Sequence, residues 1–462
     1  MTLKQISKTV ATLRFSVLCL TAMLASAARA EKPNILIIIA DDLGADKVGA
    51  YGAEGAPRTP QLDRLAEDGV LFRTCWGTPL CSSARASLLT GKYPFRTGVF
   101  ATLMTLRPEE TILPEVLSPL GYRSGLFGKW HVSSFGEELA PNLAGFDYYS
   151  GALLAALPNY YRFRKTTNGV SEWVNRYETT DVVDDATAWI EEQGESPWLC
   201  CVAFHSPHLP LHPPPPALHQ VKLRGLDPRT SPVPFYNAMV EALDTETGRL
   251  LRHLGPRADK TLVIVVGDNG TTGKVIVAPR DPSQGKGTAY ETGVQVPCIV
   301  SGYGVVDPGR EVQDLVHLVD VFATVTDLVG ADNETGIDSV SFLPQLQNRT
   351  DEIQRRTTLY TEVKTDPYHC LAAETIQHCQ QAIRNDRFKV LFDQTVPAVE
   401  YYDLANDPLE RLNLNGVDLP LQMQMQFTML RWKLHATRIL PQLQSILPHA
   451  ESLLMELPFA LR

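Results

Sequence analysis

A cysteine and an arginine four residues apart lie in a stretch that predicts the start of a short helix. The stretch covers residues 79–91 and reads PLCSSARASLLTG, with Cys81 as a candidate nucleophile and Arg85 one turn later. Residues i and i+4 of a helix share a face, and a helix N-terminus presents unpaired N–H groups. Cys81 and Arg85 could therefore contact the same bound oxyanion. Taken alone, the motif leaves open a buried cysteine beside a surface arginine.

Oxygen ligands occur in two pairs, each directly after a short apolar run. The pairs are Asp41 with Asp42, and Asp268 with Asn269. Carboxylates brought together repel one another unless a cation lies between them, so the two pairs predict a divalent metal site. All-oxygen ligation favours Ca²⁺ or Mg²⁺ over zinc, and we expect Ca²⁺. Either pair by itself could instead be a capping or loop carboxylate.

Most candidate cations and proton carriers follow the other apolar runs. Lys129 and His131 follow one of these runs and His208 follows another, whereas Lys286 is a further candidate that follows no apolar run. Lys286 lies between two glycines but does not form a Walker loop, because the glycine of that motif is missing at position 280. Three further histidines, at positions 205, 212 and 219, share the stretch around His208, and isolated histidines of this kind are more often structural.

Four short apolar runs end at or just before these polar residues. They cover residues 35–40, 124–127, 198–204 and 261–266. Continuous apolar runs of this length are typical of parallel strands buried on both faces. Ligands of open α/β sheets bind beyond the carboxyl ends of the strands, so such a sheet would bring the polar residues to one crevice. Helical apolar spacing between the runs predicts helices that cover the sheet.

The length of 462 residues predicts one large domain with an appendage. We expect a catalytic domain over residues 31–350 and a smaller α+β subdomain over residues 351–462. In the second part the βα rhythm fades, and short strands are predicted near residues 359–363, 387–392 and 399–404. A Met- and Leu-rich helix is predicted from Met423 onward.

The first 30 residues have the pattern of a secretory signal peptide. Basic residues precede an apolar run over residues 15–27, and Ala-Arg-Ala follows at residues 28–30. The run is shorter than the roughly 20 residues of a spanning helix, so we expect a periplasmic or secreted protein without a stable membrane anchor. The net charge of −10 and the lack of a basic run exclude a nucleic-acid surface. Cys370 and Cys379 could form a disulfide or remain free thiols.

In combination, these motifs resemble the type I, formylglycine-dependent sulfatases of the alkaline-phosphatase-like superfamily. The resemblance rests on the Cys81 stretch and on DDLG at residues 41–44, GKWH at 128–131, PHLP at 207–210, GDNG at 267–270 and GKGT at 285–288. It extends to residues 402–408 and so covers nearly the whole mature chain. It implies a large mixed, mostly parallel sheet sandwiched by helices.

The resemblance also implies a chemistry for the cysteine. A formylglycine-generating enzyme would oxidise Cys81 to an aldehyde, whose hydrate supplies the hydroxyl that attacks sulfur. The metal would be held by Asp41, Asp42, Asp268 and Asn269 and would contact the nucleophile at position 81. At the third position of the motif, where the family has proline or alanine, this chain has Ser83.

Roles for the remaining site residues follow from the same resemblance. Arg85 would steady the hydrated aldehyde, while Lys129 and Lys286 would bind the sulfate charge. His208, with Lys286, would protonate the leaving alcohol. His131 would accept the proton whose loss expels sulfate. These roles place positive groups around an anion whose charge shifts toward the leaving oxygen.

The predicted function is hydrolysis of a sulfate ester, on a sulfated carbohydrate. The loops that would select the substrate, at residues 100–106, 148–164 and 205–219, carry aromatic and basic side chains that suit a sulfated sugar. One alternative is a phosphonate or phosphodiester hydrolase of the same superfamily, since both substrates are tetrahedral oxyanions. Another is an anion-binding protein without activity, in which Cys81 stays unmodified.

Overall fold

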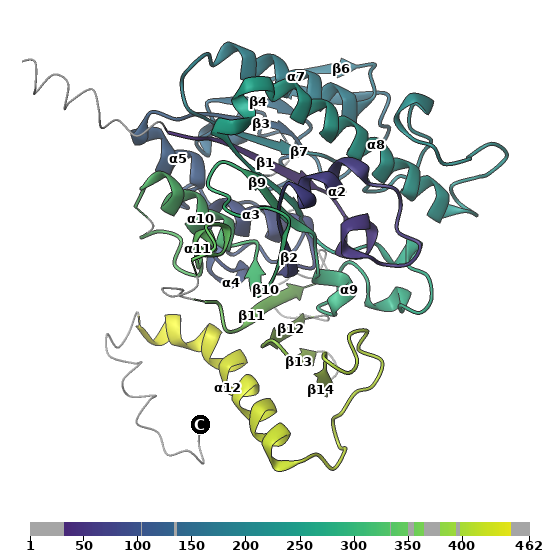
Figure 1. Ribbon diagram of the computed structural model, residues 1–462, viewed down its shortest axis with the longest axis vertical. Coiled ribbons are helices and arrows are strands. Elements are labelled where there is room, and N and C mark those ends of the chain that lie inside the picture. The colour runs from purple at the N-terminus through teal and green to yellow at the C-terminus, as the bar shows by residue number, and fades with distance from the viewer. Residues whose placement is uncertain are drawn as a thin grey trace, which may run out of the picture. The chain divides into compact units, whose positions relative to one another are not determined.

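The structure is a computed structural model that describes residues 32–102, 104–133, 136–332, 334–349, 355–364, 379–393 and 398–444. A ten-stranded sheet forms its centre, with strand order β10-β2-β9-β8-β1-β7-β3-β4-β5-β6 (Figure 1). The predicted signal peptide lies outside the described residues. The same holds for the predicted disulfide, because Cys370 and the side chain of Cys379 are not described.

The strands of the large sheet are β1 (Asn34–Ala40), β2 (Gly69–Trp76), β3 (Arg123–Gly128), β4 (Tyr148–Gly151), β5 (Phe163–Thr167), β6 (Val170–Val174), β7 (Trp198–Ala203), β8 (Thr261–Gly267), β9 (Cys298–Gly302) and β10 (Arg310–His317). The four predicted apolar runs correspond to β1, β3, β7 and β8. These four strands are neighbours in the order β8-β1-β7-β3 and pair in parallel. Their carboxyl ends therefore meet at one edge of the sheet.

The helices are α2 (Pro60–Glu67), α3 (Cys81–Thr90), α4 (Pro94–Thr97), α5 (Leu113–Leu117), α6 (Ala140–Leu143), α7 (Glu178–Glu192), α8 (Pro232–Leu254), α9 (Glu291–Val294), α10 (Asp320–Val329), α11 (Leu343–Leu346) and α12 (Leu421–Gln444).

Side chains of β1 alternate between two apolar layers. Ile35 and Ile37 share a core with α3, α5 and α10, while Leu36 and Ile38 share another with α2, α7 and α8. Burial on both faces explains why this strand is continuously apolar.

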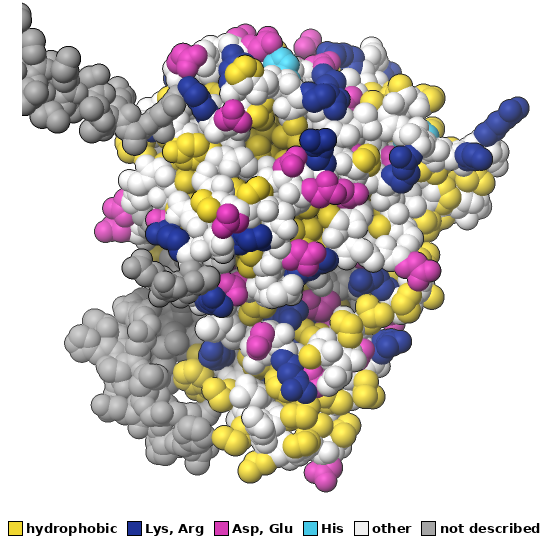
Figure 2. Space-filling model, in the orientation of Figure 1, with side chains coloured by type: hydrophobic (Ala, Val, Ile, Leu, Met, Phe, Trp, Pro, Cys, Tyr) yellow, Lys and Arg dark blue, Asp and Glu magenta, His cyan; other side chains and the backbone are white. Residues whose placement is uncertain are grey.

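The sheet is mixed because β9 is antiparallel to β2 and β8, and β5 is antiparallel to β4 and β6. The predicted mixed, mostly parallel sheet between helices is confirmed. Every helix among the described residues is too short or too polar to cross a membrane. On the face that Figure 2 shows, acidic and basic side chains are interspersed.

A second, antiparallel sheet follows, with strands β11 (Leu359–Lys364), β12 (Cys379–Arg384), β13 (Phe388–Asp393) and β14 (Ala398–Asp403). Helix α12 packs on it through Phe427 and Leu430, in a core that also contains Tyr360 and Phe388. The three predicted strands correspond to β11, β13 and β14, whereas β12 was not predicted. The helix begins two residues before the predicted Met423. The domain boundary placed at residue 350 stays a prediction.

Candidate active site

Cys81 is the first residue of α3, and both Cys81 and Arg85 are buried, which excludes the alternative of a surface arginine. Arg85, one turn later, connects α3 to two strand ends. Its Nη2 donates to Asp268 Oδ2 at 3.1 Å, and its Nη1 donates to the backbone oxygen of Lys129 at 2.9 Å. Its buried Nε has no hydrogen-bond partner. Arg85 therefore fixes the position of the carboxylate beside Cys81 and keeps one N–H group for a further acceptor.

The start of α3 is shaped by two hydroxyl groups that bond to the backbone before it. Ser83 Oγ donates to the backbone oxygen of Leu80 at 2.8 Å and lies 2.7 Å from Thr78 Oγ1. No side chain caps the first N–H groups of the helix. The helix N-terminus thus keeps its partial positive charge uncompensated next to Cys81. The serine that departs from the family pattern is accommodated by a hydrogen bond within its own helix turn.

The four predicted oxygen ligands are all buried, and hydrogen bonds join three of them, Asp42, Asp268 and Asn269. Asp268 Oδ1 accepts the backbone N–H groups of Asp42 at 3.1 Å and of Asn269 at 2.8 Å. Asn269 Nδ2 donates to Asp42 Oδ1 at 2.8 Å. Asp41 follows β1 directly, and Asp42 has a left-handed backbone with φ of 65°. That conformation is costly for a non-glycine residue, so its presence at this strand end is a feature of the site.

Two lysines and a histidine surround these carboxylates and Cys81. Lys129 Nζ forms an ion pair with Asp41, and Lys286 Nζ lies 2.5 Å from Asp42 Oδ1. Lys286 Nζ also donates to Cys81 Sγ at 3.3 Å. His208 Nε2 lies 3.8 Å from Asp42 Oδ2. The structure thus brings these predicted residues, which come from five separate segments, to the same strand ends.

The two site histidines differ in their surroundings. His208 Nδ1 faces the backbone oxygen of Leu209 at 2.8 Å, so Nδ1 carries a hydrogen and Nε2 faces the carboxylates. His131 has a left-handed backbone, and its Nε2 lies 3.2 Å from Ser82 Oγ. His131 Nδ1 is buried without a partner. Each histidine therefore has one ring nitrogen available for proton transfer.

Burial and neighbouring charges shift the pKa values of the site. Burial, and then Lys129 and Arg85, lower the pKa of His131 well below 6.5, so His131 is neutral at pH 7 and able to accept a proton. Burial, and then the charge of Asp41, raise the pKa of the Cys81 thiol. The thiolate is the nucleophilic form of cysteine, so an unmodified Cys81 would be a poor nucleophile here.

The pKa values of two site carboxyl groups are shifted in opposite directions. Burial alone would raise the pKa of Asp41, but Lys129 and His208 hold it well below its usual value. Burial, and then repulsion from Asp41, raise the pKa of Asp268 to about 7. Burial would lower the pKa of Lys286, yet Asp42 raises it well above its usual value. The site therefore has closely spaced charges of both signs, with Lys286 positive at neutral pH.

The donor set fits a hard divalent cation. One possible ligand atom from each of Asp41, Asp42, Cys81 and His208 lies within 4.8 Å of the others. Asp41 Oδ1 and Asn269 Oδ1 are buried and have no hydrogen-bond partner. Buried oxygen acceptors normally have partners, and oxygen ligands are what Ca²⁺ and Mg²⁺ prefer. The sequence assigned His208 to substrate binding and proton transfer, so its place among these possible ligand atoms was not predicted, and the predicted ligand Asp268 is not in this group.

Two residues that the sequence did not single out support the His208 loop. Tyr160 Oη donates to the backbone oxygens of His205 at 2.8 Å and His208 at 2.7 Å. His205 Nδ1 pairs with the buried Glu178 at 2.8 Å, and the ring of His212 stacks on Tyr160. His205 and His212 are therefore structural, as their isolated positions indicated. No sequence motif links Tyr160 or Glu178 to this loop.

The loop that carries Lys286 is held from the second sheet. The backbone N–H of Ala289 donates to Gln380 Oε1 at 3.0 Å, and that of Glu291 donates to Glu410 Oε2 at 2.5 Å. Lys389 Nζ, completely buried, lies 3.2 Å from Glu291 Oε1 and 2.7 Å from Glu410 Oε1. The C-terminal sheet thereby contributes to the position of a residue in the candidate site.

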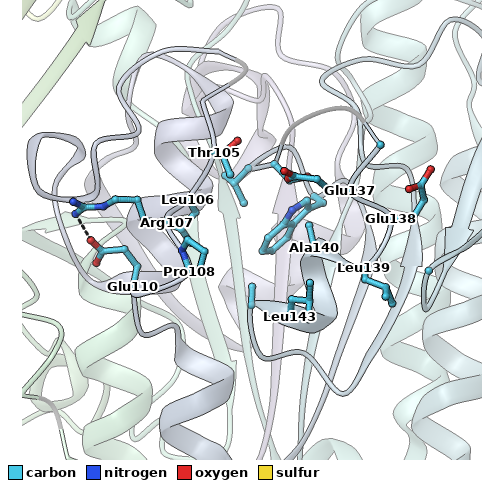
Figure 3. Close-up of a pocket in the computed structure, with 16 residues that line it drawn as sticks. Thr105, Leu106, Arg107, Pro108, Glu110, Glu137, Glu138, Leu139, Ala140 and Leu143 are labelled. Atoms are coloured by element: carbon cyan, nitrogen blue, oxygen red, sulfur yellow. Dashed lines mark hydrogen bonds and ion pairs between the residues drawn. The ribbon is translucent and has the colours of Figure 1, made fainter.

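A cavity of about 480 Å³ lies beside the segment that follows β3. Trp130, which lies between Lys129 and His131, lines it, and its buried Nε1 has no hydrogen-bond partner. Figure 3 shows Arg107 and Glu110 on one side of this cavity and Leu143 on the other. The wall is mostly apolar, so the cavity offers apolar contact area and one buried N–H donor.

Residues 33–331 match the family described as Sulfatase. The chain belongs to the sulfatase family. Enzymes of this family hydrolyse sulfate esters, and the fold agrees with its alkaline-phosphatase-like superfamily. Residues 285–438 of this sulfatase also match the C-terminal region of N-sulphoglucosamine sulphohydrolase, a match that begins at the loop of Lys286.

Named relatives of this sulfatase act on sulfated carbohydrates. The N-acetylgalactosamine-6-sulfatase of Homo sapiens is 30% identical over 358 residues, which are 68% of this chain and 66% of that protein. The ulvan-active sulfatase of Formosa agariphila is 26% identical and covers 83% of this chain and 77% of its own length. The crystal structure of Ps i-CgsB superimposes with a TM-score of 0.73 at 25% identity, covering 87% of this chain and 92% of that one.

Proposed function

We propose that this sulfatase hydrolyses a sulfate ester on a sulfated carbohydrate, with a formylglycine made from Cys81 and a divalent cation, preferably Ca²⁺. The observation that carries the proposal is the buried cluster around Cys81 Sγ. Lys286 Nζ lies 3.3 Å from this sulfur, and Asp42 Oδ1 lies 3.9 Å from it. A thiol whose pKa is raised gains nothing catalytically from such surroundings, whereas a hydrated aldehyde would be bound by them.

A formylglycine at position 81 and a bound cation would supply two functions. The hydrated formylglycine would provide the hydroxyl that attacks sulfur. A cation held by Asp41, Asp42, Asp268 and Asn269 would withdraw charge from a sulfate oxygen. Asp41 Oδ1 and Asn269 Oδ1, which have no other partner, support this ligand set.

The side chains of this chain would then divide the remaining work. Lys129 and Lys286 place positive charge where the sulfate oxygens must lie, and Arg85 holds Asp268 and offers its free Nε–H. Preorganised charges of this kind stabilise a transition state because they need no reorientation during the reaction. The charge on Lys286 persists at neutral pH because Asp42 raises its pKa.

Proton transfer is assigned to the two histidines. His208 would donate from Nε2 to the leaving alcohol as the doubly protonated imidazolium, in which the Nδ1 hydrogen is held by the backbone oxygen of Leu209. Burial lowers the pKa of His208, with Asp42 and Asp41 opposing this shift, so the imidazolium that acts as the acid is the minor form at neutral pH. His131, neutral because its pKa is lowered, would accept the proton whose loss allows the sulfate to depart. Maturation requires a formylglycine-generating enzyme. Export to the periplasm or the medium is proposed from the signal-like residues 1–30 alone.

Sulfate release tests this proposal. The purified enzyme is incubated with an aryl sulfate, with sulfated mono- and oligosaccharides, and with an aryl phosphodiester and an aryl phosphonate. We expect turnover of the sulfate esters, with the carbohydrate esters preferred. Turnover of the phosphodiester or phosphonate at a much higher kcat/KM would favour the alternative hydrolase. Absence of turnover with all substrates would favour an anion-binding protein.

A further inference from the structure

We infer that the β5–β6 hairpin carries a second sugar-binding surface, which holds a sulfated oligosaccharide a few sugar residues away from the ester that is cleaved. The surface consists of Trp173 on β6 and of Arg162 and Arg164 on or next to β5, and we call it the hairpin platform. The inference deepens the proposed function and rests on it. It assigns the substrate class as an oligomeric or polymeric sulfated carbohydrate and not a free monosaccharide.

The strand register places the platform at the edge of the sheet that carries the candidate site. Strand β5 pairs with β4 only at Thr167 opposite Ser150 and Thr166 opposite Gly151. Gly151 is the last residue of β4, so the rest of β5 extends beyond the carboxyl end of β4. At about 3.3 Å per residue, Arg164 lies about 7 Å beyond that end. Lys129 and His131 follow the carboxyl end of the neighbouring parallel strand β3.

The lateral separation is suited to a short saccharide. Strands β3, β4, β5 and β6 are consecutive in the sheet, so three inter-strand steps separate β3 from β6. At about 4.8 Å per step, the separation is about 14 Å. A monosaccharide bound with its sulfate at Lys129 would not reach Trp173, whereas a chain of a few sugars would.

The chemistry of the platform is complementary to a sulfated sugar. Trp173 is 60% exposed, and the guanidinium of Arg162 lies 5.3 Å from its ring centroid. Arg164 lies directly opposite Trp173 in the ladder, on the same face of the hairpin. Among the described residues, Arg162 forms no ion pair with a carboxylate. An exposed indole offers a flat face to the C–H groups of a pyranose, and a guanidinium binds sulfate oxygens through two N–H groups.

The cavity beside Trp130 contacts the platform through Glu138. Glu138 lines the cavity (Figure 3). It accepts a hydrogen bond from Arg164 Nη2 at 3.1 Å. Gly169, in the turn between β5 and β6, lines the cavity too. Trp130 Nε1 remains as a buried donor without a partner.

The experiment compares substrates of two lengths. Wild-type enzyme is assayed with an aryl sulfate, a sulfated monosaccharide, and sulfated hexasaccharides from carrageenan, ulvan and glycosaminoglycans. We expect the best hexasaccharide to have a kcat/KM at least about 10-fold above that of the monosaccharide with the same sulfate. The substitution Trp173→Ala should remove about 10-fold of this preference through KM, which corresponds to about 1.4 kcal/mol. Trp173→Tyr should restore most of it.

Matched variants separate binding from folding. Val170→Ala alters another exposed residue of β6 and should leave kcat/KM unchanged for every substrate. Arg162→Gln should raise KM for the hexasaccharide at low salt and less at high salt, because the contact is electrostatic. Turnover of the aryl sulfate should be unchanged in all these variants, which shows that the catalytic site is intact.

Three results would overturn the inference. One is a wild-type enzyme that prefers the monosaccharide. Another is an unchanged hexasaccharide preference in Trp173→Ala. A third is a change of oligomeric state in Trp173→Ala, measured by light scattering, with KM unaffected, which would identify the platform as a subunit interface. Wild-type enzyme that releases sulfate from no ester would refute the proposed function itself, and the aryl sulfate distinguishes this failure from the others.

Discussion

Lys389 is a buried cation whose removal should destabilise the second sheet in a pH-dependent manner. Its Nζ lies between the carboxylates of Glu291 and Glu410, and 4.9 Å from the centre of the Trp76 ring. Arg384 Nη1 also pairs with Glu291, at 3.0 Å. The substitution Lys389→Met keeps the length of the side chain and removes its charge. Two buried carboxylates would then share one remaining cation.

The expected cost follows from the burial of this group. Removing one partner of a buried ion pair costs about 3–5 kcal/mol, because the other charge is left without compensation. Protonation of Glu410 would reduce this cost, because it removes one of the two buried negative charges. Burial already raises its pKa to about 7, with Lys389 opposing the rise and Glu291 adding to it. Without Lys389 this pKa should rise further.

The sign of the pH dependence follows from proton linkage. A carboxyl group whose pKa is raised in the folded state binds more protons in the folded protein than in the unfolded chain. Its contribution to stability is therefore complete below the pKa of the unfolded state and is lost as the pH rises to the pKa of the folded state. The window therefore runs from about pH 4.5 to beyond pH 7. The defect of Lys389→Met should be smaller at pH 5 than at pH 8 by up to about 1.4 kcal/mol, the value reached when the pKa of Glu410 rises by one unit or more.

Urea unfolding at pH 5 and pH 8 measures this defect. The control is Arg387→Met, which breaks the ion pair with Asp403 in the same sheet, where the arginine is 47% exposed. That exposed pair should contribute only about 0–1 kcal/mol to the free energy of unfolding at either pH. A second variant, Lys389→Met with Glu410→Gln, should lose the extra pH dependence. A defect of Lys389→Met that is below 1 kcal/mol or equal at both pH values would refute the argument.

Two further predictions concern the candidate site. A strong chelator should abolish sulfate release, and Ca²⁺ or Mg²⁺ should restore it, because the buried carboxylates of Asp41, Asp42 and Asp268 need a cation between them. Turnover by enzyme that elemental analysis shows to be metal-free would contradict this prediction. His208→Ala should lower kcat for sugar sulfates by about 10²–10⁴-fold and much less for an aryl sulfate whose phenolate leaves without help. Equal losses for both ester types would make His208 a sulfate-binding residue and Lys286 the better candidate for the acid.

The sequence predicted the strands that carry the site because their environment leaves a clear pattern. β1 is apolar at every position after Asn34, since both of its faces are covered, and the first residue after the strand is the polar Asp41. β3, β7 and β8 follow the same rule, which is why the four segments could be assigned to one edge of a sheet. The helix start at Cys81 was predictable from local residues as well. Each of these patterns is set within a few neighbouring residues.

What the sequence did not predict depends on partners far along the chain. Strand β12 begins with Cys-Gln-Gln, which does not alternate in polarity, and it is held by pairing with β11 and β13. Lysine is a residue type that usually lies at the surface. Lys389 is nevertheless completely buried, and it pairs there with carboxylates from two other segments. Tyr160 supports the His208 loop across 48 positions. A single sequence contains no local signal for such contacts.

The chemical state of Cys81 tests the central claim most directly. Mature protein from its native host is digested with trypsin, and the peptide over residues 74–85 is analysed by mass spectrometry together with sulfate release from the same preparation. We predict that the cysteine is replaced by an aldehyde and that the aldehyde fraction scales with activity. An intact thiol in protein that releases sulfate would contradict the account.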